Sequence, residues 1–156
     1  MKKYTLQFVL LIMAAVFAGK TLASNTVNVY KSASCGCCTK WLSHLNDNGF
    51  ETTYSNESNM SAIKDSLGIP KSHRSCHTGV VVHSEGKYVF EGHIPAETIK
   101  RFLSKPPAQA LGLTVPGMPI GSPGMEIGDR KDYYEIYLIL EDGTTELYET
   151  ANDNHS

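Results

Sequence analysis

The stretch KSASCGCCTKW (residues 31–41) contains three of the chain's four cysteines within four residues. Cys35 and Cys38 have the C-x-x-C spacing of a thiol–disulfide redox pair. Cys37 lies between them, where such a pair needs no third thiol. A disulfide among these neighbours would close almost no loop and would hold no distant parts of the chain together. The group therefore predicts a reactive or metal-binding cluster.

The segments on either side place this cluster between a strand and a helix. TVNVY (residues 26–30) alternates like a short strand, and TKWLSHLNDNG (residues 39–49) predicts a helix that Ser32 or Ser34 is available to cap. The N-terminus of a helix favours a thiolate over a thiol, because unpaired N–H groups and the helix dipole stabilise negative charge. The cysteines are thus suited to nucleophilic chemistry or to soft-metal binding, and the pattern alone does not choose.

The following segments predict a mixed α/β fold. The expected elements are a strand at 50–55, a helix at 59–69, a hairpin at 78–83 and 87–93, a helix at 94–105, a Gly/Pro/Met-rich loop at 112–126 and a hairpin at 132–140 and 144–150. The order β-α-β-α-β-β-α is thioredoxin-like, with C-x-x-C where that fold carries it. We expect a thioredoxin-like core at 24–107, an extension at 108–151 packed on the core and the site, and a frayed tail at 152–156.

The first residues predict export. Lys2 and Lys3 precede an apolar run at 6–18 and small residues that suit cleavage, which is the layout of a signal peptide over residues 1–23. The apolar run is shorter than the ~20 residues that a membrane-spanning helix needs, so we expect no membrane insertion after signal removal. Fourteen basic and sixteen acidic residues form no basic stripe, which argues against a nucleic-acid partner.

The fourth cysteine favours metal binding over disulfide exchange. In a thioredoxin fold, the loop before the third strand faces the C-x-x-C turn and carries a cis-proline. Here no proline occurs between residues 71 and 94, and Cys76 and His77 hold the positions that would face the turn. A redox enzyme would lose its peptide-binding proline, whereas a metal site would gain a thiolate and an imidazole. The alternative for His77 is a surface position.

Other candidate ligands have weaker signals. His93 ends the predicted fourth strand near the site, as a ligand or as a helix-capping residue. Met118 and Met125 lie in the Gly/Pro loop, where a thioether suits Cu(I) but also fills gaps in cores. His44 should turn away from Cys38 on its helix and lie at the surface. Three histidines are expected in exposed loops, turns or the tail: His73, His83 and His155.

The donor types favour copper. Thiolate, thioether and imidazole form a soft set that matches Cu(I) first and zinc second. A structural zinc site normally uses two ligand pairs separated by a longer spacer. Three cysteines in four residues do not easily surround one ion tetrahedrally, but a thiolate can bridge several soft cations. Cys37 is therefore interpreted as sharing metal with its neighbours.

Four motifs together resemble the bacterial copper-resistance protein CopG family: CGCC-x2-W-x2-H, SCHT, EGHIPAE-x-I-K-R-x-L and GLTVPGMPIGSPGME, at residues 35–44, 75–78, 91–103 and 112–126. The likeness runs from about residue 27 to 148. It implies a periplasmic thioredoxin-like domain whose C-terminal extension contributes to a cysteine-bridged multinuclear copper centre, and a role in handling Cu(I) and Cu(II). The candidate ligands are Cys35, Cys37, Cys38, Cys76, His77, His93, Met118 and Met125.

We therefore expect a monomeric periplasmic protein that binds copper ions, with copper efflux or other copper-handling proteins as partners. The sequence leaves open whether the protein is an enzyme, namely a copper oxidoreductase that interconverts Cu(I) and Cu(II). One alternative is a thiol–disulfide oxidoreductase with Cys35 as nucleophile and Cys38 as resolving thiol, against which the missing proline argues. The other is a passive copper chaperone, which nothing in the sequence separates from redox turnover.

Overall fold

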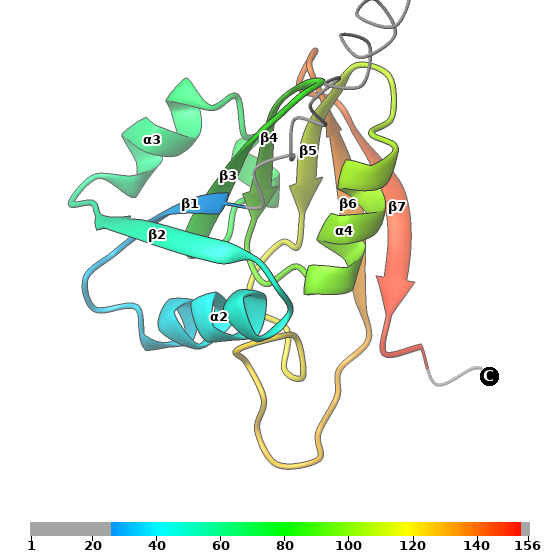
Figure 1. The fold of residues 1–156 in the computed structure, drawn as a ribbon. Coiled ribbons are helices and arrows are strands. Elements are labelled where there is room, and N and C mark those ends of the chain that lie inside the picture. Colours follow the sequence, from blue (N-terminus) through cyan, green and yellow to red (C-terminus); the bar gives the residue numbers. More distant parts are fainter. Residues whose placement is uncertain (1–25, 154–156) are drawn as a thin grey trace, which may run out of the picture.

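A computed structural model describes residues 26–153 (Figure 1), so the predicted signal peptide at 1–23 lies outside the described residues. This part of the chain forms seven strands, three α-helices and one 3-10 turn. In order they are β1 (Thr26–Lys31), α2 (Gly36–Asp47), β2 (Glu51–Asn56), α3 (Met60–Ser66), η1 (Lys71–His73), β3 (His77–His83), β4 (Gly86–Glu91), α4 (Ala96–Ser104), β5 (Ala110–Thr114), β6 (Tyr134–Leu140) and β7 (Thr145–Ala151). None of these helices has the length and apolar content that crossing a membrane requires.

All seven strands belong to one sheet, in the order β2-β1-β3-β4-β5-β6-β7. The β1–β2 and β4–β5 pairs are parallel, and the other neighbouring strands are antiparallel. In the β1–β3 pair, Lys31 lies opposite His77. The turn that follows β1 and the loop that precedes β3 therefore meet at one end of the sheet. This register brings the two cysteine-bearing segments together.

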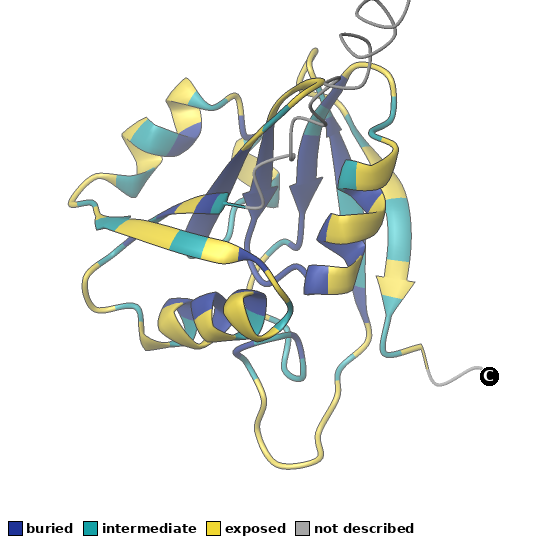
Figure 2. Ribbon diagram, viewed as in Figure 1, coloured by how far each residue is buried: buried dark blue, intermediate teal, exposed yellow. Residues whose placement is uncertain are grey.

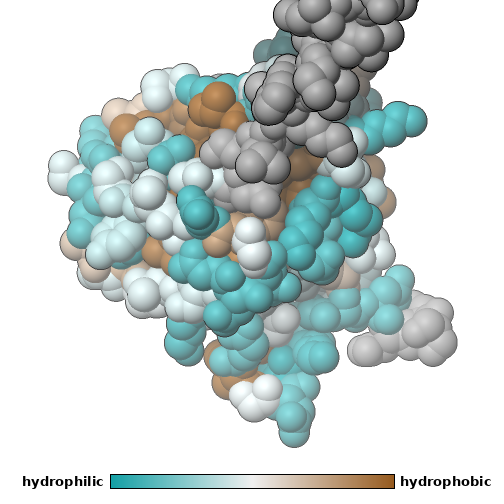
Figure 3. Space-filling model, viewed as in Figure 1, coloured by the Kyte–Doolittle hydropathy of each residue, from teal (hydrophilic) through white to brown (hydrophobic). Residues whose placement is uncertain are grey.

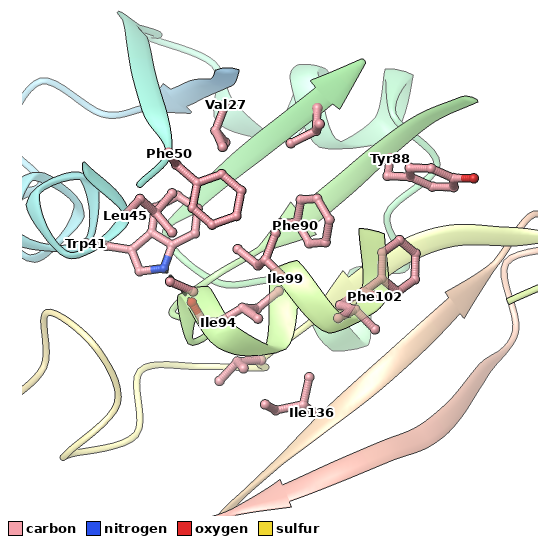
Figure 4. Packing of buried hydrophobic residues seen from close by; sticks show 14 of the residues in the cluster. Val27, Trp41, Leu45, Phe50, Tyr88, Phe90, Ile94, Ile99, Phe102 and Ile136 are labelled. Carbon is pink, nitrogen blue, oxygen red and sulfur yellow. Dashed lines mark hydrogen bonds between the residues drawn. The ribbon is translucent and has the colours of Figure 1, made fainter. Parts of the chain in front are cut away.

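One face of the sheet is covered by α2 and α4, whose inner sides are buried while their outer sides are exposed (Figures 1 and 2). Trp41, Phe90 and Phe102 pack in this layer without exposed surface (Figure 4). Burying one such side chain stabilises the fold by about 1.5–3 kcal/mol. Because strand side chains alternate, the apolar residues of β1 and β4 that face this layer are separated by residues that face the other side.

The second face carries a smaller apolar cluster. Val80 and Val89 of the sheet pack there with Ile69, which follows α3. Asn59 caps α3, and its side chain accepts a hydrogen bond from the Ala62 N–H. Lys64 is the one fully buried residue of α3, whereas its apolar residues Met60 and Ile63 are half-buried. A polar side chain is therefore the most deeply buried part of this helix.

Exposed large hydrophobic side chains are scattered over the described residues. They belong to strands β2, β3 and β7 and to the segment between β5 and β6: Tyr54, Val82, Met118, Ile127, Tyr133 and Leu147. The face drawn in Figure 3 carries mostly hydrophilic side chains with smaller hydrophobic areas between them. Isolated apolar residues of this kind are ordinary on protein surfaces.

The predicted mixed α/β fold is confirmed, with two local differences. The first helix begins at Gly36 rather than Thr39, so Cys37 and Cys38 lie in its first turn. Its N-cap is Cys35 without a side-chain hydrogen bond, and the Ser32 hydroxyl contacts the Ser34 hydroxyl instead. The expected serine cap is therefore wrong.

The second difference is strand β5, which takes up the first residues of the predicted Gly/Pro/Met-rich loop. β5 pairs with β4 on one side and β6 on the other, so residues 110–114 extend the sheet. A Cβ added to Gly112 would lie 1.8 Å from the Val89 carbonyl oxygen. A glycine inside a strand often marks such a close backbone approach. Gly112 was interpreted as part of a loop, but its missing side chain allows β5 to pair closely with β4.

Candidate metal centre

The cysteine turn stands at the start of α2. Cys35 is the N-cap, and a disulfide joins it to Cys38. Cys37 is a free, half-buried thiol between the two bonded cysteines. The first N–H groups of a helix have no partner within the helix, so they and the helix dipole stabilise negative charge here. A helix N-terminus is therefore a suitable place for a metal group with negatively charged sulfur ligands.

Cys76 approaches the turn from the end of the loop before β3. Its Sγ lies 3.6 Å from Cys38 Sγ and 3.9 Å from Cys37 Sγ, while the Cys35 and Cys37 sulfurs are 3.5 Å apart. All four sulfurs lie within 4.8 Å of one another. Two segments distant in sequence therefore place four sulfur donors in a volume the size of a small metal centre. Reducing the disulfide would make all four available as metal ligands.

His77 and His93 extend this group on the side of Cys76. Cys76 Sγ lies 3.2 Å from His77 Nδ1 and 3.3 Å from His93 Nε2. Both imidazoles are fully buried, and their ring centroids are 4.8 Å apart. The three side chains form a second group of possible ligands that shares Cys76 with the first. The surface alternative for His77 is therefore wrong.

The histidines are held neutral. Burial is the main reason why the pKa of His77 lies well below its usual value, and the neighbouring His93 and Lys64 lower it further. Burial also lowers the pKa of His93, against an opposing contribution from the Pro123 carbonyl. Neutral imidazole is the form that binds metals. Both residues are thus in the right protonation state at neutral pH.

The tautomers also suit a metal. His93 Nδ1 lies 2.8 Å from the Pro123 carbonyl oxygen, which can only accept a hydrogen bond. Nδ1 therefore carries the proton and Nε2 presents a lone pair towards Cys76, an arrangement common among metal-binding histidines. His93 is not the cap of α4. Within the described part of the chain, His77 Nε2 is a buried polar atom without a hydrogen-bond partner. The nitrogen of His77 that faces Cys76 is Nδ1, so Nδ1 and not Nε2 is the candidate ligand atom of this residue.

The thiol of Cys76 is strongly influenced by burial. Burial, and next the neighbouring Cys37, raise the pKa of the Cys76 thiol to about 12. Cys76 is therefore protonated in the metal-free protein at neutral pH. A soft cation that binds there must displace this proton.

The segment between β5 and β6 lies across the site. The Ser75 hydroxyl donates to the Gly117 carbonyl, and the Pro123 carbonyl accepts from His93. A Cβ added to Gly124, whose φ is +86°, would lie 2.8 Å from the Cys37 carbonyl oxygen. The segment thus contacts both cysteine-bearing loops, and Figure 1 shows it passing beside α2.

Each methionine of this segment follows a glycine that contacts a cysteine-bearing loop, but among the described residues no contact between a methionine sulfur and the cysteines identifies it as a ligand. Met118 follows Gly117 and has 52% of its surface exposed, whereas Met125 follows Gly124 and is half-buried. Both backbones therefore start close to the cysteine loops. Their roles as ligands stay predictions.

His44 is not the surface residue that the sequence suggested. Its Nε2 accepts the Ala96 N–H at 3.0 Å, and it is half-buried beside the start of α4. Burial lowers its pKa. The remaining histidines lie away from the site or outside the described residues: His73 packs on Tyr137, His83 lies at the β3–β4 turn, and His155 is not described.

Two further features adjoin the site. The ring of Trp41 lies 4.4 Å from that of His77, centroid to centroid, and its indole N–H donates to the Ile94 carbonyl at 2.8 Å. Sequence reasoning also missed a buried ion pair between Lys64 and Glu91. The sequence shows only a lysine in a short helix and a glutamate at the end of a strand, and charged residues at such positions are usually exposed.

Both the sequence and the fold are similar to those of known proteins. A family model described as "Protein of unknown function, DUF411" matches residues 73–125. A comparison with curated proteins gave no match. Two solved structures, named copper resistance protein copG Form 1 and Form 2, each match at 42% identity with a TM-score of 0.73 over 80% of this chain. The match covers 95% and 96% of those chains, respectively. The chain therefore belongs to the family of copper resistance protein CopG.

Proposed function

We propose that this protein is a thioredoxin-like, periplasmic copper-binding protein of copper resistance, with copper ions as its cargo. One observation carries the proposal. Four cysteine sulfurs lie within 4.8 Å of one another, and one of them, Cys76, also belongs to a buried group with His77 and His93. The solved relatives are named copper resistance proteins, which supports copper over zinc.

The donors outnumber what one ion needs. Four thiolates and two imidazoles exceed the four ligands of a tetrahedral site, and Cys76 belongs to both groups. Bridging through thiolate sulfur would let the turn and the histidines hold different ions. The proposed centre is therefore multinuclear and cysteine-bridged, with Cys35, Cys37, Cys38, Cys76, His77 and His93 as ligands.

The proposal includes the segment over the site. Met118 or Met125 would supply a neutral thioether, which favours Cu(I), and the packed Gly124 would keep water from the cysteine turn. A dry site with neutral histidines favours the lower copper charge, while the thiolates also accept Cu(II). Interconversion of Cu(I) and Cu(II), with one electron per copper passing to or from an external redox partner, is therefore part of the proposal, and other periplasmic copper-handling proteins would be the source or acceptor of copper.

The experiment is a copper titration of the fully reduced protein. Cu(I) is added anaerobically, unbound metal is removed, and copper per chain is measured by elemental analysis. We expect more than one copper per chain, and a marked loss in Cys76→Ser because Cys76 belongs to both donor groups. One equivalent or less at saturation would contradict the multinuclear centre and favour a simple chaperone.

A thiol–disulfide oxidoreductase is the second candidate, because the disulfide between Cys35 and Cys38 lies at a helix N-terminus. One observation speaks against it: Cys76 stands where such enzymes carry a proline. An insulin-reduction assay separates the two functions. Activity that survives Cys76→Ser and Cys37→Ser would favour the oxidoreductase.

A further inference from the structure

α3 is attached to the sheet by a buried charge. Lys64, its one buried residue, forms an ion pair with Glu91 at the end of β4. The two side chains are 5% and 0% exposed. Taking both charges out of water costs several kcal/mol per ion, and apolar residues of similar volume often stabilise a fold equally well. Stability alone therefore does not explain why these two charged residues lie here.

Glu91 is connected to the loop that carries Cys76. Its Oε1 accepts the Ser75 backbone N–H at 2.6 Å as well as the contact from Lys64. Its Oε2 accepts the Thr78 hydroxyl at 2.5 Å, and Lys64 Nζ donates to the same hydroxyl at 3.1 Å. The carboxylate thus binds the residue before Cys76 and the residue after His77.

Ser75 is fixed on two more sides. A Cβ added to Gly92 would lie 2.7 Å from Ser75 Cβ and 2.6 Å from the Val115 carbonyl oxygen. The Ser75 hydroxyl donates to the Gly117 carbonyl. The amide of Ser75 is therefore held by Glu91, its Cβ packs on Gly92, and its hydroxyl is held by Gly117. The amide contact is made by a side chain from another element, that of Glu91, whereas the Ser75 hydroxyl also lies 4.0 Å from the Sγ of the adjacent Cys76.

We propose that Glu91 is a positioning residue for copper binding, which holds the Cys76 sulfur in place by accepting the Ser75 N–H, with Lys64 balancing its charge. The inference rests on the proposed function. Cys76 is the donor shared by the thiolate and imidazole groups, so an error in its position affects both. Metal sites need their ligands within about 0.5 Å of the productive geometry. Losing a partner that orients a ligand typically costs 10–100-fold in metal affinity.

Two double variants isolate the acceptor. Lys64→Met with Glu91→Gln removes both charges and keeps an oxygen for the Ser75 N–H. Lys64→Met with Glu91→Leu removes the charges and the oxygen at similar volume. Neither leaves a buried unpaired charge, which would destabilise the fold by itself. Arg101→Met with Glu149→Gln, at the α4–β7 ion pair, is the control for losing a pair elsewhere.

The measurements are Cu(I) affinity against a competing chelator, hydrogen exchange of the Ser75 amide in the copper-free reduced protein, and urea unfolding. We expect the Gln double variant and the control to bind Cu(I) close to wild type. The Leu double variant should lose 10–100-fold in affinity and exchange the Ser75 amide faster. Urea unfolding ensures that affinities are compared among folded proteins.

Equal Cu(I) affinities of the two double variants, or equal Ser75 exchange, would overturn the inference. Failure of the proposed function looks different, because the wild type itself would then bind no Cu(I). In that case the Ser75 exchange rates and the alkylation rate of Cys76 decide whether Glu91 holds Cys76. If the Leu double variant does not fold, Lys64→Met with Glu91→Gln serves as the second test by itself, because it leaves no buried unpaired charge. Retained Cu(I) affinity with slow Ser75 exchange supports the inference, and loss of both overturns it.

Discussion

Replacing Gly124 by alanine should release copper without changing any donor. Gly124 has a φ of +86°, which costs an alanine about 1–2 kcal/mol. The added Cβ would lie 2.8 Å from the Cys37 carbonyl oxygen and 2.9 Å from the Trp41 nitrogen. Both atoms are backbone of α2 and cannot rotate away, so the segment over the site must move.

Gly128 supplies a matched control. Its φ of +56° also favours glycine, but an added Cβ meets nothing within 4 Å. Gly128→Ala therefore carries the backbone cost without the collision. Overpacking of this kind costs about 1–3 kcal/mol. At 1.4 kcal/mol per tenfold change, that corresponds to about a 5- to 150-fold higher population of the open segment in Gly124→Ala.

The assay follows the release of Cu(I) from the loaded protein to a Cu(I)-specific chelator under anaerobic conditions. We expect release from Gly124→Ala to be faster than from Gly128→Ala by a factor in this range, with both variants folded by circular dichroism. Equal release rates in the two variants would refute the reasoning. The segment would then pack on α2 without controlling access to the site.

Three further predictions concern the thiols and His44. Without reductant the protein should show two free thiols after unfolding in denaturant and bind less copper than the reduced form, because a disulfide joins Cys35 and Cys38; the same copper per chain in both forms would contradict this. Cys37→Ser should lower copper stoichiometry about as much as Cys35→Ser, whereas full copper loading of Cys37→Ser would remove Cys37 from the ligands. Burial lowers the pKa of His44 from 6.5, so the unfolded chain takes up a proton that the folded one does not. The free energy of unfolding should therefore fall as the pH drops below about 6.5, and fall less in His44→Gln; urea titrations at several pH values measure both slopes.

Local sequence predicted most elements of the fold. Alternation identified β1, and the cysteine spacing with a following Trp-Leu pattern identified the first helix. β5 was missed because its strand conformation depends on tertiary pairing. The segment that contains Gly112 is extended because it hydrogen-bonds to β4 on one side and to β6 on the other. No local pattern contains that information.

The candidate site was predictable where its residues are chemically distinctive. Cys76 could be placed opposite the turn because the element order implies which loop faces it, and the sulfur distances agree. The Lys64–Glu91 pair could not be predicted, because charged residues are usually exposed and its two residues belong to different elements. His44 was misplaced because its partner, the Ala96 N–H, comes from α4.

The contact between Trp41 and His77 gives the molecule a built-in optical reporter. Trp41 is the only tryptophan in the sequence, so all indole fluorescence of the chain arises from one fully buried ring. That ring lies 4.4 Å from an imidazole beside Cys76. A metal ion held by His77 would therefore sit close enough to quench the emission. The emission would then report the filling and emptying of the centre in real time, without a label or an added dye.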